Sequence, residues 1–120
     1  MKKVLIVDDH SDIRKLIRIT IGNAYEVLEA ADGMAAMQVI RCQQPSLVVL
    51  DIMMPGEMDG LQVLDAIRAE PSLKNTQVIM VTARGQAKDY ETGMSRGANA
   101  YLIKPFSPIQ LVNNIKELLK

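Results

Sequence analysis

The chain lacks the residues that mark several common classes of protein. Its single cysteine, Cys42, excludes an internal disulfide, and no apolar run approaches the roughly 20 residues of a membrane-spanning helix. Only four apolar residues follow the charged start at residues 1–3, fewer than the apolar core of a signal peptide needs. These absences predict a cytoplasmic protein that does not act at a membrane.

Aromatic residues and net charge are also scarce. Phe, Trp and Tyr make up 3% of the residues, and no glycine-rich turn follows the first apolar run, which disfavours flavin and dinucleotide binding. Fourteen basic and fourteen acidic residues cancel to a formal net charge of zero. Because no positive field would attract nucleic acid, we expect no direct nucleic-acid binding.

The apolar residues that are present fall into short runs. The chain has 120 residues, of which 48% are hydrophobic, and this predicts a single domain over residues 1–120. Runs rich in Val, Ile and Leu are typical of strands buried on both faces of a parallel sheet, and they occupy residues 4–7, 47–50, 78–81 and 101–103. A more polar run at 25–30 predicts a fifth strand at an edge.

Helical patterns separate these runs. Ser11 is the expected cap of a first helix that ends at Gly22 or Asn23, and Asp32 is the expected cap of a second. Each pattern lies between two predicted strands, as a crossover helix would.

Three more helices follow along the chain. Asp59 and Gln62 form a capping-box pattern, and Ser107 and Pro108 give a cap followed by a proline at the first helical position. Residues 86–95 form the weakest pattern. Five strands alternating with five helices predict an α/β fold with a doubly wound parallel sheet.

Residues able to take part in phosphate chemistry follow the apolar runs. Asp8 and Asp9 come after the first run, Asp51 after the second, Thr82 after the third and Lys104 after the fourth. The carboxyl ends of parallel strands lie along one edge, where open α/β sheets place their ligands. We therefore expect these five side chains to share one crevice.

The residue types favour a metal-assisted phosphoryl site. Adjacent carboxylates attract a hard cation such as Mg²⁺, which usually also binds water and a phosphoryl oxygen. From its type alone, Asp51 is a further metal ligand, a general base or a nucleophile that forms an acyl phosphate. Lys104 and Thr82 offer donors for phosphoryl oxygens, and such positioning is most of what phosphoryl transfer requires.

The motifs around these residues resemble a known family. The segments, in order, are VLIVDDH, LVVLDIMMPGEMDGL, VIMVTA and YLIKPF. Together they resemble the receiver domain of two-component response regulators, of which the chemotaxis receiver is the simplest. The resemblance implies a flavodoxin-like five-stranded parallel sheet of order 2-1-3-4-5 with five helices.

The resemblance also assigns roles at the site. It implies that Asp51 is the phosphoacceptor and that Mg²⁺ is held by Asp8, Asp9, Asp51 and the backbone carbonyl of Met53. Lys104 would bind the phosphoryl group, and its peptide bond to Pro105 would be cis.

A conformational switch is implied as well. Thr82 would be the switch hydroxyl and Tyr101 the switch aromatic, coupling the site to the face made by the fourth helix, the fifth strand and the fifth helix. The same face is the expected surface for a homodimer.

The implied partners lie on either side of the phosphoryl transfer. The donor would be a phosphohistidine on a sensor histidine kinase or a histidine phosphotransfer protein. The recipient of the signal would be a downstream output protein or a fused output domain. The protein would be a signalling module that catalyses only its own phosphorylation and dephosphorylation.

Three residues near the site depart from the simplest pattern. Glu57 belongs to a loop one residue longer than in the chemotaxis receiver, and it either reaches the metal or is an exposed loop acid, the commoner outcome. The resemblance implies that Met53 and Arg84 occupy positions that flank the path of an attacking water. Since methionine cannot orient a water as an amide can, we expect slow self-dephosphorylation.

Other interpretations fit the sequence less well. A haloacid-dehalogenase-like phosphatase would need a second aspartate where this chain has Met53. A pseudo-receiver that only binds protein would typically lose some of the five groups, which are all present. His10 is of a type that serves as a metal ligand or a general base, but it has no cysteine or second histidine as a companion, and a surface residue at a helix entrance is the commoner outcome that we expect.

Overall fold

The computed structural model describes residues 1–54, 56–83 and 87–120. Strands and helices alternate along the chain as the apolar runs predict. In chain order the elements are β1 (Lys3–Val7), α1 (Ser11–Ile21), β2 (Glu26–Ala30), α2 (Gly33–Gln43), β3 (Leu47–Asp51), α3 (Gly60–Ala69), η1 (Pro71–Leu73, a 3-10 turn), β4 (Gln77–Ala83), α4 (Ala87–Ser95), β5 (Ala100–Lys104) and α5 (Pro108–Leu118).

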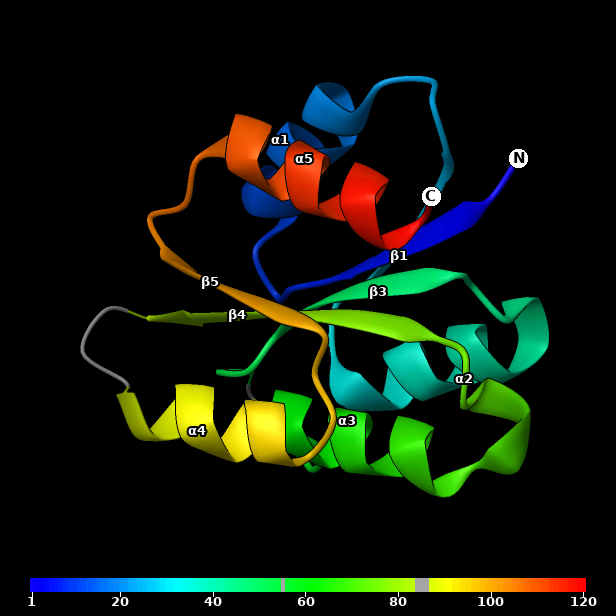
Figure 1. Ribbon diagram of the computed structural model, residues 1–120, viewed down its shortest axis with the longest axis vertical. Helices are drawn as coiled ribbons and strands as arrows, with labels where there is room; N and C mark the ends of the chain where they lie inside the picture. Colours follow the sequence, from blue (N-terminus) through cyan, green and yellow to red (C-terminus); the bar gives the residue numbers. More distant parts are fainter. Residues whose placement is uncertain (55, 84–86) are drawn as a thin grey trace.

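The five strands form one parallel sheet. Their order is β2-β1-β3-β4-β5, which confirms the predicted order 2-1-3-4-5 and the prediction that residues 25–30 form an edge strand. Helices α1 and α5 cover one face of the sheet, and α2, α3 and α4 cover the other (Figure 1). The fold is therefore the doubly wound three-layer arrangement.

Both faces of the sheet are buried. Alternate residues of a strand point to opposite faces, so Leu5 and Val7 pack with the α2–α3 side while Val4 and Ile6 pack with α1 and α5. All four are at most 1% exposed. The continuous apolar runs thus contribute to two cores, one on each face.

Most of the predicted helix caps are present. Asp32 accepts a hydrogen bond from the backbone N–H of Ala35, and Asp59 and Gln62 form the reciprocal capping box. Ser107 caps α5. Helix α4 is a short element, and the predicted helix start at Gln86 lies outside the described residues.

The predicted cap of α1 was wrong. Ser11 is the first helical residue, and His10 holds the cap position without a side-chain cap bond. The reason is local: the backbone N–H of His10 donates to Asp8 Oδ1 at 2.8 Å, so the chain turns into the helix one residue early. Within the described ranges, every helix is too short or too polar to cross a membrane.

Candidate functional site

The predicted residues meet at the carboxyl edge of the sheet. Asp8 directly follows β1, and Asp51 and Lys104 are the last residues of β3 and β5. Thr82 lies in β4, paired in register with Ile103, and is 1% exposed. Parallel pairing with short crossovers is what places side chains so distant in sequence side by side.

Lys104 bridges two buried carboxylates. Its Nζ lies 3.0 Å from Asp51 Oδ2 and 3.2 Å from Asp8 Oδ2, and the two aspartate side chains are 3% and 5% exposed. Burial would lower the pKa of Lys104, but the hydrogen bond and charge of Asp51, and then those of Asp8, outweigh burial and raise it. The ammonium group therefore stays charged between them at neutral pH.

The carboxyl of Asp51 is perturbed by its burial. Burial raises the pKa of its carboxyl above the usual value, and the hydrogen bond and charge of Lys104 offset only part of that effect. Its Oδ1 accepts a hydrogen bond from the backbone N–H of Met53 at 3.0 Å. One oxygen thus accepts from the backbone, while the other contacts the ammonium group of Lys104.

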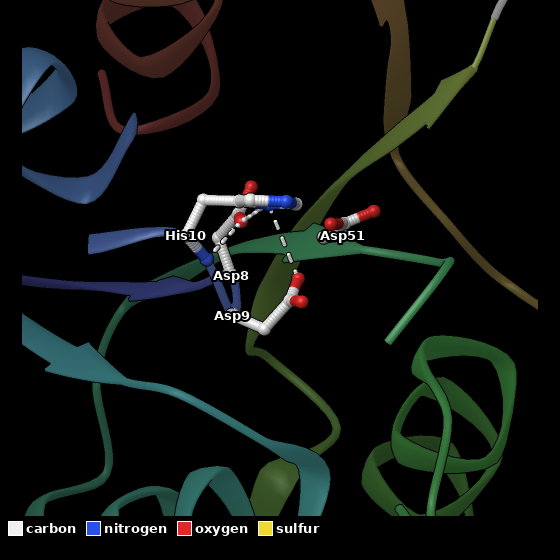
Figure 2. Close-up of side chains that lie close together, drawn as sticks. All are labelled: Asp8, Asp9, His10 and Asp51. Carbon is white, nitrogen blue, oxygen red and sulfur yellow. Dashed lines mark hydrogen bonds and ion pairs between the residues drawn. The ribbon is translucent and has the colours of Figure 1, made fainter. Parts of the chain in front are cut away.

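His10 lies over the acidic pair (Figure 2). Its Nδ1 is 3.0 Å from Asp8 Oδ1 and 3.3 Å from Asp9 Oδ1, although its side chain is 56% exposed. The hydrogen bond to Asp8, and then the charges of Asp9 and Asp8, raise the pKa of His10. The expectation of a surface residue at a helix entrance was correct for its position but missed this contact.

The cluster is suited to a metal ion. Ligand atoms of Asp8, Asp9, His10 and Asp51 all lie within 4.8 Å of one another. Over the described part of the chain, Asp9 Oδ1 is the buried side-chain oxygen that has no hydrogen-bond partner. An unsatisfied carboxylate oxygen among other carboxylates fits a hard divalent cation.

Arg14 is a site residue that the sequence did not reveal. From α1, its Nη1 donates to the backbone carbonyl of Asp8 at 2.6 Å, and its Nε donates to Glu29 of β2 at 2.9 Å. Burial would raise the pKa of Glu29, but hydrogen bonds from Arg18 and Arg14 lower it. These contacts of Arg14 hold the loop that carries Asp8 and Asp9. No local sequence motif indicates Arg14 as a site residue.

The residues that depart from the simplest pattern lie around the rim. Met53 is 59% exposed beside Asp51. Glu57 is exposed and lines, with Asp9, Met34 and Met58, a hollow of about 450 Å³. The predicted role of Arg84 lies outside the described residues.

The β5–α5 junction forms the opposite rim. The Lys104–Pro105 peptide bond is cis, as the resemblance implies. Next to it, Ile13, Leu16 and Phe106 line an apolar hollow of about 350 Å³ that also contacts Lys104. Tyr101, in β5, is partly buried against the α2–α3 side of the core.

Solved structures of similar fold are receiver domains. A putative response regulator from Chloroflexus aurantiacus is 35% identical, with a TM-score of 0.92 over 98% of this chain and 97% of that one. The chemotaxis protein CheY4 of Vibrio cholerae is 32% identical, with a TM-score of 0.89 over 98% of both chains.

Sequence relatives include longer regulators. The probable transcriptional regulator ycf27 of Cyanophora paradoxa is 42% identical over 99% of this chain and 48% of its own length. The transcriptional regulatory protein SrrA of Staphylococcus aureus is 37% identical over 98% of this chain and 48% of its own length. The chain thus spans about half the length of these curated relatives. Residues 4–116 match the response regulator receiver domain, and the chain belongs to this family of two-component signalling modules.

Proposed function

We propose that the domain, acting in the cytoplasm, accepts a phosphoryl group on Asp51 from a phosphohistidine of a sensor histidine kinase or a histidine phosphotransfer protein. The observation that carries this proposal is the position of Lys104, whose ammonium group bridges Asp51 and Asp8 beside the unsatisfied oxygen of Asp9. A nucleophilic carboxylate, a neighbouring cation and further acidic oxygens at one strand edge are the parts that phosphoryl transfer needs.

Mg²⁺ is the proposed cofactor. Asp8, Asp9 and Asp51 would hold it with the backbone carbonyl of Met53, and it would neutralise charge on the transferring phosphoryl group. The site's oxygen-rich donor set fits this ion. Glu57 is exposed on the adjacent rim, as expected of a loop acid.

The transfer itself uses the chain's own side chains. The Asp51 carboxylate forms a bond to phosphorus as the phosphorus–nitrogen bond breaks, and that bond's electron pair returns to the donor imidazole. Lys104 exchanges its contact with Asp51 for one with a phosphoryl oxygen, and the Thr82 hydroxyl supplies a further donor. Because burial raises the pKa of Asp51, uptake falls as the pH drops through that pKa and the nucleophile becomes protonated.

The donor needs a surface to bind beside Asp51. The apolar hollow lined by Ile13, Leu16 and Phe106 contacts Lys104 directly, and Leu16 is 50% exposed. Exposed apolar residues grouped beside a charged site are typical of protein-binding surfaces. We assign this hollow to the phosphohistidine-bearing partner.

The signal would leave through the opposite side of the site. Thr82 moves toward the phosphoryl group and Tyr101 turns inward, which alters the face made by α4, β5 and α5. That face would serve a downstream output protein, a fused output domain or a homodimer. A pseudo-receiver is disfavoured because all five chemical groups are present.

Phosphoryl uptake from a small donor tests the proposal. Phosphoramidate contains a phosphorus–nitrogen bond like that of phosphohistidine, and with Mg²⁺ it should add one phosphoryl group to the wild-type chain. Intact mass measures the gain. Asp51→Asn and an EDTA-treated wild type are the matched controls, and both should remain unmodified. Uptake by Asp51→Asn equal to that of the wild type would overturn the proposal.

Met53 and Arg84 are proposed to set the lifetime of the phosphoryl group. The exposed Met53 side chain stands beside Asp51 and offers no hydrogen bond to an attacking water. The double variant Met53→Asn with Arg84→Glu should lose its phosphoryl group several times faster than the wild type, as followed by intact mass over time. If the double variant and the wild type lose the phosphoryl group at the same rate, Met53 and Arg84 do not set its lifetime.

A further inference from the structure

We propose that His10 Nδ1 is an additional ligand at the metal site and gives it extra affinity for divalent transition ions such as Zn²⁺, Ni²⁺ and Co²⁺. This inference rests on the proposed function for the location of the metal. It adds a nitrogen ligand to a site that otherwise offers oxygen atoms.

The distances fit two ligands on one ion. His10 Nδ1 lies 3.0 Å from Asp8 Oδ1 and 3.3 Å from Asp9 Oδ1. Two ligand atoms bound at about 2.1 Å, with an angle between tetrahedral and right, are separated by about 3.0–3.4 Å. The imidazole nitrogen therefore already lies at the spacing of a fellow metal ligand from each of the two carboxylate oxygens.

The backbone holds the ring in place. The N–H of His10 donates to the same Asp8 Oδ1 that faces the ring, which fixes the turn between β1 and α1. The ring is still 56% exposed, so it can exchange a proton with solvent when an ion binds. Asp9 Oδ1, 3.3 Å from the ring nitrogen, is buried and, among the described residues, lacks a hydrogen-bond partner.

Mg²⁺ and divalent transition ions differ in the ligand atoms that they prefer. Mg²⁺ prefers oxygen ligands and keeps several waters, whereas imidazole nitrogen suits Zn²⁺, Ni²⁺ and Co²⁺. Mg²⁺ would thus use the carboxylates, and a transition ion would use the carboxylates together with His10. Since both share Asp8 and Asp9, a transition ion bound through His10 would compete with Mg²⁺.

Calorimetric titration with Ni²⁺ and with Mg²⁺ tests the assignment. In His10→Gln, Ni²⁺ affinity should fall by more than about tenfold, the scale on which even outer partners of a ligand change metal affinity. Mg²⁺ affinity should not fall, because Mg²⁺ would be held by the carboxylate oxygens and not by the His10 ring. Asp8→Asn, the control, should weaken both ions. Unchanged Ni²⁺ affinity in His10→Gln would overturn the inference.

Nuclear magnetic resonance of the wild type gives a second readout that needs no variant. His10 is the only histidine in the chain, so its ring nitrogen signals are assigned without ambiguity. Adding Zn²⁺ should shift Nδ1 most, and a ring that keeps its metal-free signals would contradict ligation. If the ring signals do not move with Zn²⁺ but phosphoramidate and Mg²⁺ still modify Asp51, the His10 inference fails and the proposed function stands. Loss of that modification with intact Ni²⁺ binding would instead remove the proposed function.

Discussion

Replacing Lys104 with methionine is expected to lower the free energy of unfolding by about 3 kcal/mol at neutral pH. This lies at the low end for breaking a buried ion pair because the Lys104 side chain is 24% exposed. The substitution leaves Asp8 and Asp51 in mutual repulsion with no ammonium group between them. Urea unfolding followed by circular dichroism measures the difference from the wild type.

The loss should depend on pH in a defined window. Asp51 has a raised pKa, so as the pH falls through it the carboxyl becomes neutral and the missing lysine matters less. Lys104 also has a raised pKa, so its contribution is complete below the usual lysine pKa and is lost as the pH rises through the raised value. The two proteins should therefore differ most between these limits.

Asp51→Asn is the matched control for this ion pair. It removes a buried charge while Lys104 keeps Asp8, and the amide oxygen can still accept from the Met53 N–H. We expect this variant to be at least as stable as the wild type at neutral pH. Equal stability losses in Lys104→Met and Asp51→Asn would contradict the assigned electrostatics.

Gly60→Ala is expected to destabilise the domain by about 3 kcal/mol, the upper range for overpacking. Helix α3 begins at Gly60, against the end of β3. A Cβ there would overlap the carbonyl oxygen of Asp51 and lie 2.6 Å from Ile52 Cα. Both obstacles are backbone atoms, so relief requires moving the strand end that carries Asp51. Thermal and urea unfolding measure the loss.

Gly56→Ala separates steric overlap from backbone strain. Gly56 has a φ of 104°, but a Cβ added there meets no atom within 4 Å. The cost should be about 1–2 kcal/mol, that of an ordinary residue in a left-handed conformation. A loss in Gly60→Ala no greater than in Gly56→Ala would refute the close packing of α3 on β3.

The strand-end cluster was predictable because two simple regularities determine it. Continuous apolar runs indicate strands buried on both faces, and parallel strands gather their carboxyl ends at one edge. Asp8 and Lys104 are 96 residues apart in the chain, yet that reasoning placed them in the same crevice, where Lys104 contacts Asp8. The roles carried over from the family remain proposals for the experiments above.

The contacts missed by the sequence depend on side-chain direction. Arg14 reaches the Asp8 carbonyl from α1, and its charge partner Glu29 lies on an edge strand. His10 turns toward the acidic pair because the Asp8 side chain captures its backbone N–H, which also displaced the predicted cap from Ser11. Periodicity identifies helices and strands, but it cannot indicate which way a long side chain or a two-residue turn points.

The most direct test of the account is chemical trapping of the modified residue. Borohydride reduces the carbonyl of an acyl phosphate to an alcohol and releases phosphate, which converts a phosphorylated aspartate to homoserine. After treatment with phosphoramidate and Mg²⁺, followed by reduction and peptide mass spectrometry, we expect homoserine at position 51. Homoserine at position 8 or 9, or a phosphate retained on a serine or threonine without homoserine at 51, would contradict it.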